Sequence, residues 1–277
     1  MKTQFKRRVW TLFGQKFMVD NAWQADLALL DIGPDKKWWE AEPGLLISES
    51  KTVTRCYSID NPQAFYFKRY IYPFKRTFGY WCRTSKAAVE LFAYSEMNKL
   101  NIACPQVVAF GERRYFGLLF GCFIATKTIP NTQTLSEFAL EKWYLMAASE
   151  KAYFYQQISE QVIDYLIKAH QGGFFHYDLK WRNILLQEID KKTLKVIIID
   201  PPRARTSQLL KKWHRVRDLS ALARLSVELL TPYQKMRFLI QYLGKNQQKG
   251  EAKALYRAIE KHLSRRFPAP LNITLKK

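Results

Sequence analysis

One segment, residues 174–200, constrains the fold more than any other part of the chain. It reads FFHYDLKWRNILLQEIDKKTLKVIIID and follows a helical pattern that is broken at Gly172 and Gly173. Two short apolar runs flank a polar turn at 188–192, which predicts a hairpin whose second strand ends at Asp200. The polar residues that precede the hairpin have the spacing H-x-D-x-K-x-x-N and are His176, Asp178, Lys180 and Asn183. The segment therefore predicts a loop of chemically reactive side chains held between buried strands.

The rest of the pattern separates into a strand-rich first part and a helix-rich second part. In the first part we expect strands at 45–48, 52–59, 64–70, 105–108 and 115–126, turns at 48–51 and 111–114, and one helix at 85–100. In the second part the apolar periodicity predicts helices at 136–146, 154–170, 218–230, 233–243 and 252–263. The two parts join near residues 126–128.

Residues 1–44 form a basic block of their own. Aromatic and aliphatic side chains recur every four residues among lysines and arginines, at Phe5, Val9, Phe13 and Phe17. This spacing predicts an amphipathic helix on a basic N-terminal extension, packed on the main body or lying on an anionic membrane surface.

The charge balance limits the partners. The chain carries 45 Lys and Arg against 24 Asp and Glu, a formal charge of +21, which favours an anionic partner such as nucleic acid, a membrane surface or an anionic substrate. No apolar run approaches the roughly 18–20 residues of a membrane span, and the four cysteines have neither disulfide-scaffold nor zinc spacing. We therefore expect a cytoplasmic protein.

The segment 174–200 resembles the catalytic loop and metal-binding strand of the protein-kinase-like superfamily. The resemblance implies an α+β, two-lobed fold: a small sheet-rich N-lobe with one helix at 45–128, and a helical C-lobe at 129–277. It implies that Asp178 is the catalytic base, that Lys180 offers charge to the migrating phosphoryl group, and that Mg²⁺ is bound by Asn183 and Asp200. These residue types suit phosphoryl transfer, because the reaction needs a positioned base and Mg²⁺ prefers oxygen ligands.

The same resemblance places the nucleotide phosphates in the N-lobe. Lys68, in the run FYFKRY, resembles the phosphate-binding lysine of the family, with Glu90 as its expected partner and Glu96 as the alternative. Strand alternation leaves open whether Lys68 or Arg69 takes this role. The expected phosphate turn contains no glycine, so contacts to ATP would come from the remaining candidates, Ser48, Ser50, Lys51 and, at the junction, Thr126.

Features before and after the hairpin distinguish between kinase families. Tyr177 stands where protein kinases carry an arginine, and Asp200 is followed by Pro-Pro-Arg instead of Phe-Gly. The stretches IIIDPPRAR and HRVRDLSAL look like the bacterial lipopolysaccharide kinases, which phosphorylate heptose or Kdo sugars of the inner core. This resemblance implies an ATP- and Mg²⁺-dependent transferase, and it implies that Asp218 braces the catalytic loop.

An anionic lipopolysaccharide acceptor would account for the basic charge. Basic clusters at 2–8, 68–75, 203–217 and 265–266 could dock it at the cytoplasmic face of the inner membrane, and the aromatic side chains of Tyr177, Trp181 and Trp213 could stack on sugar rings. Three alternatives stay open: a small-molecule or protein kinase of the same fold, a degenerate kinase-like protein, and a nucleic-acid-binding protein. The last lacks any recognised nucleic-acid-binding motif, so we expect no nucleic-acid partner.

Overall fold

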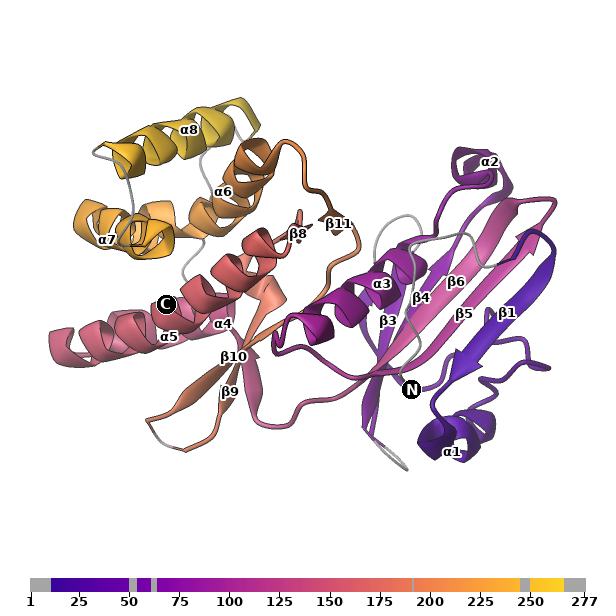
Figure 1. Cartoon of the computed structure of the whole chain (residues 1–277). Coiled ribbons are helices and arrows are strands. Elements are labelled where there is room, and N and C mark those ends of the chain that lie inside the picture. The colour runs from indigo at the N-terminus through magenta and orange to yellow at the C-terminus, as the bar shows by residue number, and fades with distance from the viewer. Residues whose placement is uncertain (1–10, 50–53, 61–63, 191, 245–249, 267–277) are drawn as a thin grey trace. The chain divides into compact units, whose positions relative to one another are not determined.

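The computed structural model describes residues 11–49, 54–60, 64–190, 192–244 and 250–266. The chain divides into two compact units, which are considered separately here (Figure 1). Unit 1 consists of Met1–Glu96 and Pro105–Ile129, and unit 2 of Met97–Cys104 and Pro130–Lys277.

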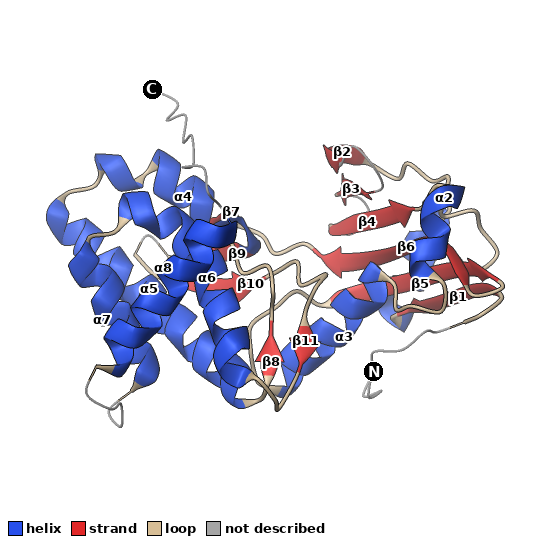
Figure 2. Cartoon of the chain, turned by 90° about the horizontal axis from the view of Figure 1, so that it is seen from above, coloured by secondary structure: helices blue, strands red, loops and turns tan. Residues whose placement is uncertain are grey.

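Unit 1 is built on a six-stranded sheet in which every neighbouring pair of strands is antiparallel. Its strands, drawn red in Figure 2, follow the order β1 (Gly14–Val19), β5 (Val107–Tyr115), β6 (Leu118–Lys127), β4 (Phe65–Ile71), β3 (Thr54–Ile59) and β2 (Leu45–Glu49). Aromatic and β-branched residues dominate the central strands, as expected of a pleated surface with a buried face.

Three α-helices accompany this sheet: α1 (Gln24–Leu29), α2 (Phe74–Thr77) and α3 (Lys86–Lys99), with single 3₁₀ turns at Asn21–Trp23 and Phe78–Tyr80. Helix α3 is the helix predicted at 85–100. The Ser85 hydroxyl accepts a hydrogen bond from the backbone N–H of Ala88 at 3.2 Å, which caps its first turn.

The predicted helix through Phe13 and Phe17 is wrong. Residues Gly14–Val19 form β1, which pairs with β5, and the Phe17 ring packs 5.6 Å from that of Phe123. The part of the prediction that covers residues 1–10 lies outside the described residues. The segment after β1 supplies much of the core of unit 1, because Trp23, Leu27, Ile32 and Trp38 are all at most 3% exposed. Residues 14–44 thus form part of the sheet unit instead of a separate extension.

The predicted turn at 111–114 is also wrong, because these residues lie inside β5 and the chain reverses at Phe116-Gly117. Glu112 and Arg114 are fully buried and paired through Arg114 Nε and Glu112 Oε1 at 2.5 Å. Gly111 lies against Phe123, where an added Cβ would meet the ring at 2.1 Å. The polar run is a buried network within a strand.

Unit 2 contains five α-helices among its described residues: α4 (Leu135–Glu141), α5 (Ala148–Gln171), α6 (Lys211–Leu229), α7 (Pro232–Leu243) and α8 (Glu251–Arg266). A three-stranded antiparallel sheet has the order β10 (Leu194–Ile198), β9 (Ile184–Glu188), β7 (Thr132–Thr134), and a short ladder joins β11 (Arg205–Thr206) to β8 (Phe174–Phe175). Single 3₁₀ turns occupy Trp143–Leu145 and Trp181–Asn183. In the described part of the chain no helix is both long and apolar enough to cross a membrane.

Helix α5 fixes where the loop after it begins. One face of the helix is buried, at Ile158, Val162, Leu166 and Ala169, as the predicted stripe requires. Gly173 then takes a positive φ of 74°, and an added Cβ would lie 2.7 Å from the backbone oxygen of Ser207. The chain therefore leaves the helix through a turn that only glycine fits, and enters β8 directly before His176.

Candidate active site

Asp218, on α6, braces the loop that carries the predicted base. Its Oδ2 accepts the backbone N–H of His176 at 2.8 Å, and its Oδ1 accepts that of Tyr177 at 2.7 Å. The Asp218 side chain is fully buried, and hydrogen bonds to a buried carboxylate are among the stronger ones in proteins. The loop conformation is thus set from a helix that begins more than 30 residues later, as the family resemblance implies.

His176 links the loop to the strand that ends at Asp200. Its Nδ1 accepts the backbone N–H of Asp178 at 3.2 Å, so its Nε2 donates to the carbonyl of Ile199 at 3.0 Å. The ring is fully buried, and this burial lowers the pKa of His176, although the nearby carboxylates of Asp218, Asp200 and Asp178 oppose the shift. Burial and these two hydrogen bonds therefore favour a neutral His176 whose contacts order the loop.

Asp178 and its neighbours form a small polar cluster. Lys180 Nζ lies 2.7 Å from Asp178 Oδ1, and the Asn183 side-chain amide donates to the Asp178 backbone oxygen at 2.8 Å and to its Oδ2 at 3.3 Å. Asp178 keeps 14% of its side chain exposed. Its carboxylate is therefore oriented by two neighbours while a part of it stays open to solvent.

Asp200 follows β10 and is tied to the same cluster, since the N–H of Ile199 donates to the Asn183 carbonyl at 3.0 Å. Its backbone is left-handed, with φ 57°, as is that of Tyr177 with φ 67°. Such a conformation costs a non-glycine residue roughly 1–2 kcal/mol, and it persists where the surrounding structure enforces it. Tyr177, which precedes the predicted base, and Asp200, the predicted metal ligand, are both held in this left-handed conformation.

The donor set fits a magnesium ion. The Nδ2 of Asn183 is used within the loop, which leaves its Oδ1 as the side-chain oxygen available to a cation, and Asp200 supplies a carboxylate. No cluster of three or more His, Cys, Asp or Glu that could hold a metal occurs in the described ranges. One carboxylate and one amide suit Mg²⁺, which keeps waters and substrate phosphates as its other ligands.

In unit 1 the side chain of Lys68, and not that of Arg69, contacts α3. Lys68 Nζ lies 3.1 Å from Glu90 Oε1, and the Tyr70 hydroxyl donates to the same oxygen at 2.5 Å. Arg69 points to the other face, where it donates to the Ala41 carbonyl at 2.5 Å and to the Tyr57 hydroxyl at 3.0 Å. The expected pairing of Lys68 with Glu90 is therefore present.

The remaining candidates for nucleotide binding lie in strands or outside the described residues. Ser48 is exposed within β2 beside an irregularity in the β2–β3 register, so the predicted turn at 48–51 begins later than expected. Ser50 and Lys51 lie outside the described residues. Thr126 is half-buried near the end of β6, opposite Tyr66 and Val107.

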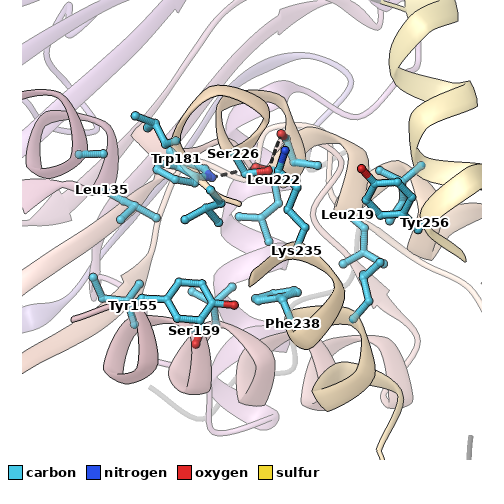
Figure 3. Close-up of a pocket in the computed structure, with 18 of the residues that line it drawn as sticks. Leu135, Tyr155, Ser159, Trp181, Leu219, Leu222, Ser226, Lys235, Phe238 and Tyr256 are labelled. Carbon is cyan, nitrogen blue, oxygen red and sulfur yellow. Dashed lines mark hydrogen bonds between the residues drawn. The ribbon is translucent and has the colours of Figure 1, made fainter. Parts of the chain in front are cut away.

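Of the three aromatic residues expected to stack on sugar rings, only Trp213 is substantially exposed, at 50%. Tyr177 is 4% exposed. Trp181 faces an apolar cavity of about 160 Å³ among helices α4 to α8, and its Nε1 donates to the Leu222 carbonyl at 2.8 Å (Figure 3). The prediction of sugar stacking by Trp181 is therefore wrong, because its ring belongs to the interior of unit 2.

A basic cluster around Tyr177 is the part of the site that the sequence did not resolve. The guanidinium of Arg217 lies 4.0 Å from the centre of the Tyr177 ring, and that of Arg205 lies 5.7 Å from it. The sequence contained a weak signal, because both arginines fall in the basic run 203–217, but the pairing depends on β11 lying beside β8.

Comparisons with known proteins bear on the family and on the fold of the chain. The sequence model of the lipopolysaccharide kinase (Kdo/WaaP) family matches residues 38–242. Among solved structures, "WaaP in complex with acyl carrier protein" has a TM-score of 0.66 and 20% sequence identity, covering 91% of this chain and 99% of that one. No curated protein matches the sequence. The α+β kinase-like fold, with a sheet-rich N-terminal part and a helical C-terminal part, is confirmed.

Proposed function

The chain belongs to the lipopolysaccharide kinase (Kdo/WaaP) family, and from this premise we propose that it transfers a phosphoryl group from ATP to a hydroxyl of a heptose or Kdo sugar in the lipopolysaccharide inner core. The observation that carries the proposal is the braced loop of unit 2, in which Asp218 and His176 fix the backbone on either side of Tyr177 and orient Asp178. Such positioning is what phosphoryl transfer chiefly requires of a protein.

In this mechanism Asp178 accepts a hydrogen bond from the acceptor hydroxyl and takes its proton as the oxygen attacks. Lys180, 2.7 Å from the same carboxylate, orients it and offers positive charge to the phosphoryl oxygens during transfer. The ammonium of Lys68, held by Glu90, binds the phosphates of ATP. Ser48, Ser50 and Thr126 are proposed as further nucleotide contacts.

Asn183 and Asp200 would hold Mg²⁺, through Oδ1 of the amide and through the carboxylate. When bound, the ion supplies positive charge that neutralises the phosphate oxygens. Hydrogen bonds within the chain orient both ligands. The side-chain amide of Asn183 donates to Asp178, and the backbone carbonyl of Asn183 accepts the N–H of Ile199, the residue before Asp200.

The test is phosphate transfer from ATP and Mg²⁺ by the wild type and by Asp178→Ala. The acceptors are dephosphorylated lipopolysaccharide core, a generic protein and no acceptor. We expect transfer to the core, and a rate about 10²–10⁴-fold lower in the variant because the base is gone. Asp164→Ala is the matched control, since Asp164 is an exposed carboxylate on α5 that pairs with Lys168 one turn later.

Other results would contradict the proposal in distinct ways. Transfer to protein alone would indicate a protein kinase of this fold, and undiminished transfer by Asp178→Ala would remove its role as base. No transfer together with no ATP binding would favour a degenerate kinase-like protein. The reaction is proposed to take place in the cytoplasm, at the inner face of the membrane where the basic surface would meet anionic lipid.

An acyl carrier protein is proposed as a protein partner. The similar solved structure is a complex with such a protein, and carriers of this kind bear acyl chains. Two features of this chain support such a partner. Its charge of +21 favours an anionic protein, and the apolar cavity next to Trp181 suits an acyl chain (Figure 3). Co-purification with an acylated carrier, reduced by Leu230→Lys at a half-buried position that lines the cavity, is the expected result. Equal recovery of the acylated and unacylated carriers would contradict a role of the cavity.

A further inference from the structure

The residue between His176 and Asp178 carries a cationic cluster. The ring of Tyr177 has the Arg217 guanidinium 4.0 Å from its centre and the Arg205 guanidinium 5.7 Å from it, and the centre of the Trp213 ring lies 6.2 Å from the centre of the Tyr177 ring. The Tyr177 hydroxyl is hydrogen-bonded to His214 Nδ1, which fixes the ring. Two arginines from separate elements, β11 and α6, therefore meet on one immobilised aromatic side chain next to the proposed base.

The charge of this cluster is not balanced by the protein. Neither Arg205 nor Arg217 forms a salt bridge with any acid in the part of the chain that the structure describes, and the Nε of Arg217 is buried without a hydrogen-bond partner there. Asp218, the residue that follows Arg217, is fully buried and already accepts two backbone N–H groups. Burial and the positive charges of Arg266 and Arg203 lower the pKa of Arg217, although Tyr177 and Asp218 oppose the shift.

An arrangement of this kind is costly unless it serves an anion. Like charges near one another repel, and a partly buried guanidinium without a carboxylate loses hydration that nothing restores. A guanidinium held over a ring nevertheless keeps its in-plane N–H groups free, and these match the oxygens of a phosphate or carboxylate in bidentate geometry. Tyr177 directly precedes Asp178 on the loop that Asp218 braces, so the arginine cluster and the proposed base are held by one segment of backbone.

We propose that Arg205 and Arg217 bind an oxyanion already present on the acceptor, either a phosphate or a sugar carboxylate, next to the hydroxyl that Asp178 deprotonates. The exposed ring of Trp213 forms the apolar wall of this subsite. The inference rests on the proposed function and narrows it, since the preferred acceptor is an anionic sugar and a neutral sugar is a poor substrate.

The experiment measures kcat/KM at saturating ATP for four preparations of one core oligosaccharide. The first is intact but has the target hydroxyl free, the second is freed of phosphates with hydrofluoric acid, the third has its carboxylates reduced to alcohols, and the fourth has both treatments. The wild type, Arg205→Gln and Arg217→Gln are compared on all four. Arg257→Gln is the control, because Arg257 is an exposed arginine on α8. It lies nine residues, or about 13 Å of helix, before Arg266, which is the arginine of α8 whose charge acts on Arg217.

We expect wild-type kcat/KM to fall about 10- to 100-fold on the preparation that lacks the recognised anion, and the two single treatments identify whether it is phosphate or carboxylate. Each arginine variant should lose a similar factor on the intact acceptor but little more on the doubly treated one, since both changes remove the same contact. Arg217→Lys, which keeps the charge and loses the fork, should fall between wild type and Arg217→Gln.

Three results would count against the inference. If both arginine variants lost the same factor on every acceptor, the arginines would only support the loop. If the wild type transferred phosphate equally well to all four preparations, the anionic subsite would be refuted while the kinase activity stood. If the wild type transferred phosphate to none of them, the proposed function itself would fail. Melting temperatures of the variants separate a loss of folding from each of these results.

Discussion

The two units hold Lys68 and Lys180, the lysines proposed to act on the phosphates, in different ways. In unit 1, Lys68 is 20% exposed and paired with a carboxylate that is 3% exposed, and the pairing connects a strand to a helix through side chains alone. In unit 2, Lys180 is 30% exposed and pairs with Asp178 two residues away, on a loop whose backbone is bound by Asp218 and His176. The first arrangement rests on contacts between side chains, which include the ion pair and the Tyr70 hydroxyl on Glu90, whereas the second rests on a backbone that is held by hydrogen bonds.

This difference separates the expected consequences of mutation. A change to the pair in unit 1 should leave the fold in place and misplace one ammonium group, so its effect falls on nucleotide binding. A change to the brace in unit 2 leaves buried backbone N–H groups without acceptors, so it should affect both the stability of the unit and the rate of transfer. The predictions below test that separation.

Asp218→Ala should have the largest effect. It removes the acceptor of the His176 and Tyr177 N–H groups, and at about 1–3 kcal/mol for each buried orphan the free energy of unfolding should fall by about 2–6 kcal/mol. Transfer should fall with it, because the loop is released. Urea unfolding with kinetics below the transition checks both, and Asp218→Asn, which keeps one acceptor oxygen, should be intermediate. A stable but inactive Asp218→Ala would show that the brace acts only on catalysis.

Glu90→Gln should have a smaller and more selective effect. Replacing the carboxylate by an amide removes the charge that fixes Lys68, so the KM for ATP should rise about tenfold while kcat and melting temperature change little. Glu96→Gln is the matched control on the same helix, because Glu96 was the alternative partner and Glu90 is the residue within 3.1 Å of Lys68. Equal changes in KM for the two variants would mean that the observed ion pair does not position the lysine.

How far the sequence leads differs between the two units. In unit 2 the loop residues His176, Asp178, Lys180 and Asn183 lie within eight positions of one another, so a short window of sequence contains the whole motif, and the family resemblance implies their roles. Asp218 was reached through the family resemblance. The basic cluster on Tyr177 was not foreseen, because it requires the pairing of Arg205 with Phe175 across 30 residues.

In unit 1 the errors share one cause, which is that long-range partners decide the local structure. The run Gly-Glu-Arg-Arg reads as a turn, yet Glu112 accepts from Ser85 and Arg114, while Arg114 also donates to the carbonyls of Tyr80, Arg83 and Gly117. A buried ion pair with complete hydrogen bonding has no signature in a short window. Likewise, the spacing of Phe13 and Phe17 suggested a helix, but pairing with β5 makes this segment a strand.

The smallest predicted effect concerns pH and again distinguishes the loop of unit 2. Burial lowers the pKa of His176 from 6.5, so the folded state keeps the ring neutral at a pH at which the unfolded chain protonates it. The unfolded state then binds more protons, and the free energy of unfolding should fall as the pH drops below about 6.5, by at most about 1.4 kcal/mol per pH unit for this residue. Urea titrations between pH 8 and 5 measure the slope of the free energy of unfolding against pH.

His176→Gln should reduce this slope, whereas His262→Gln should reduce it less, because the pKa of His262 is also lowered but its ring is less buried. If both variants kept the full wild-type slope, other groups would carry the acid sensitivity, and His176 would not be held neutral by the loop.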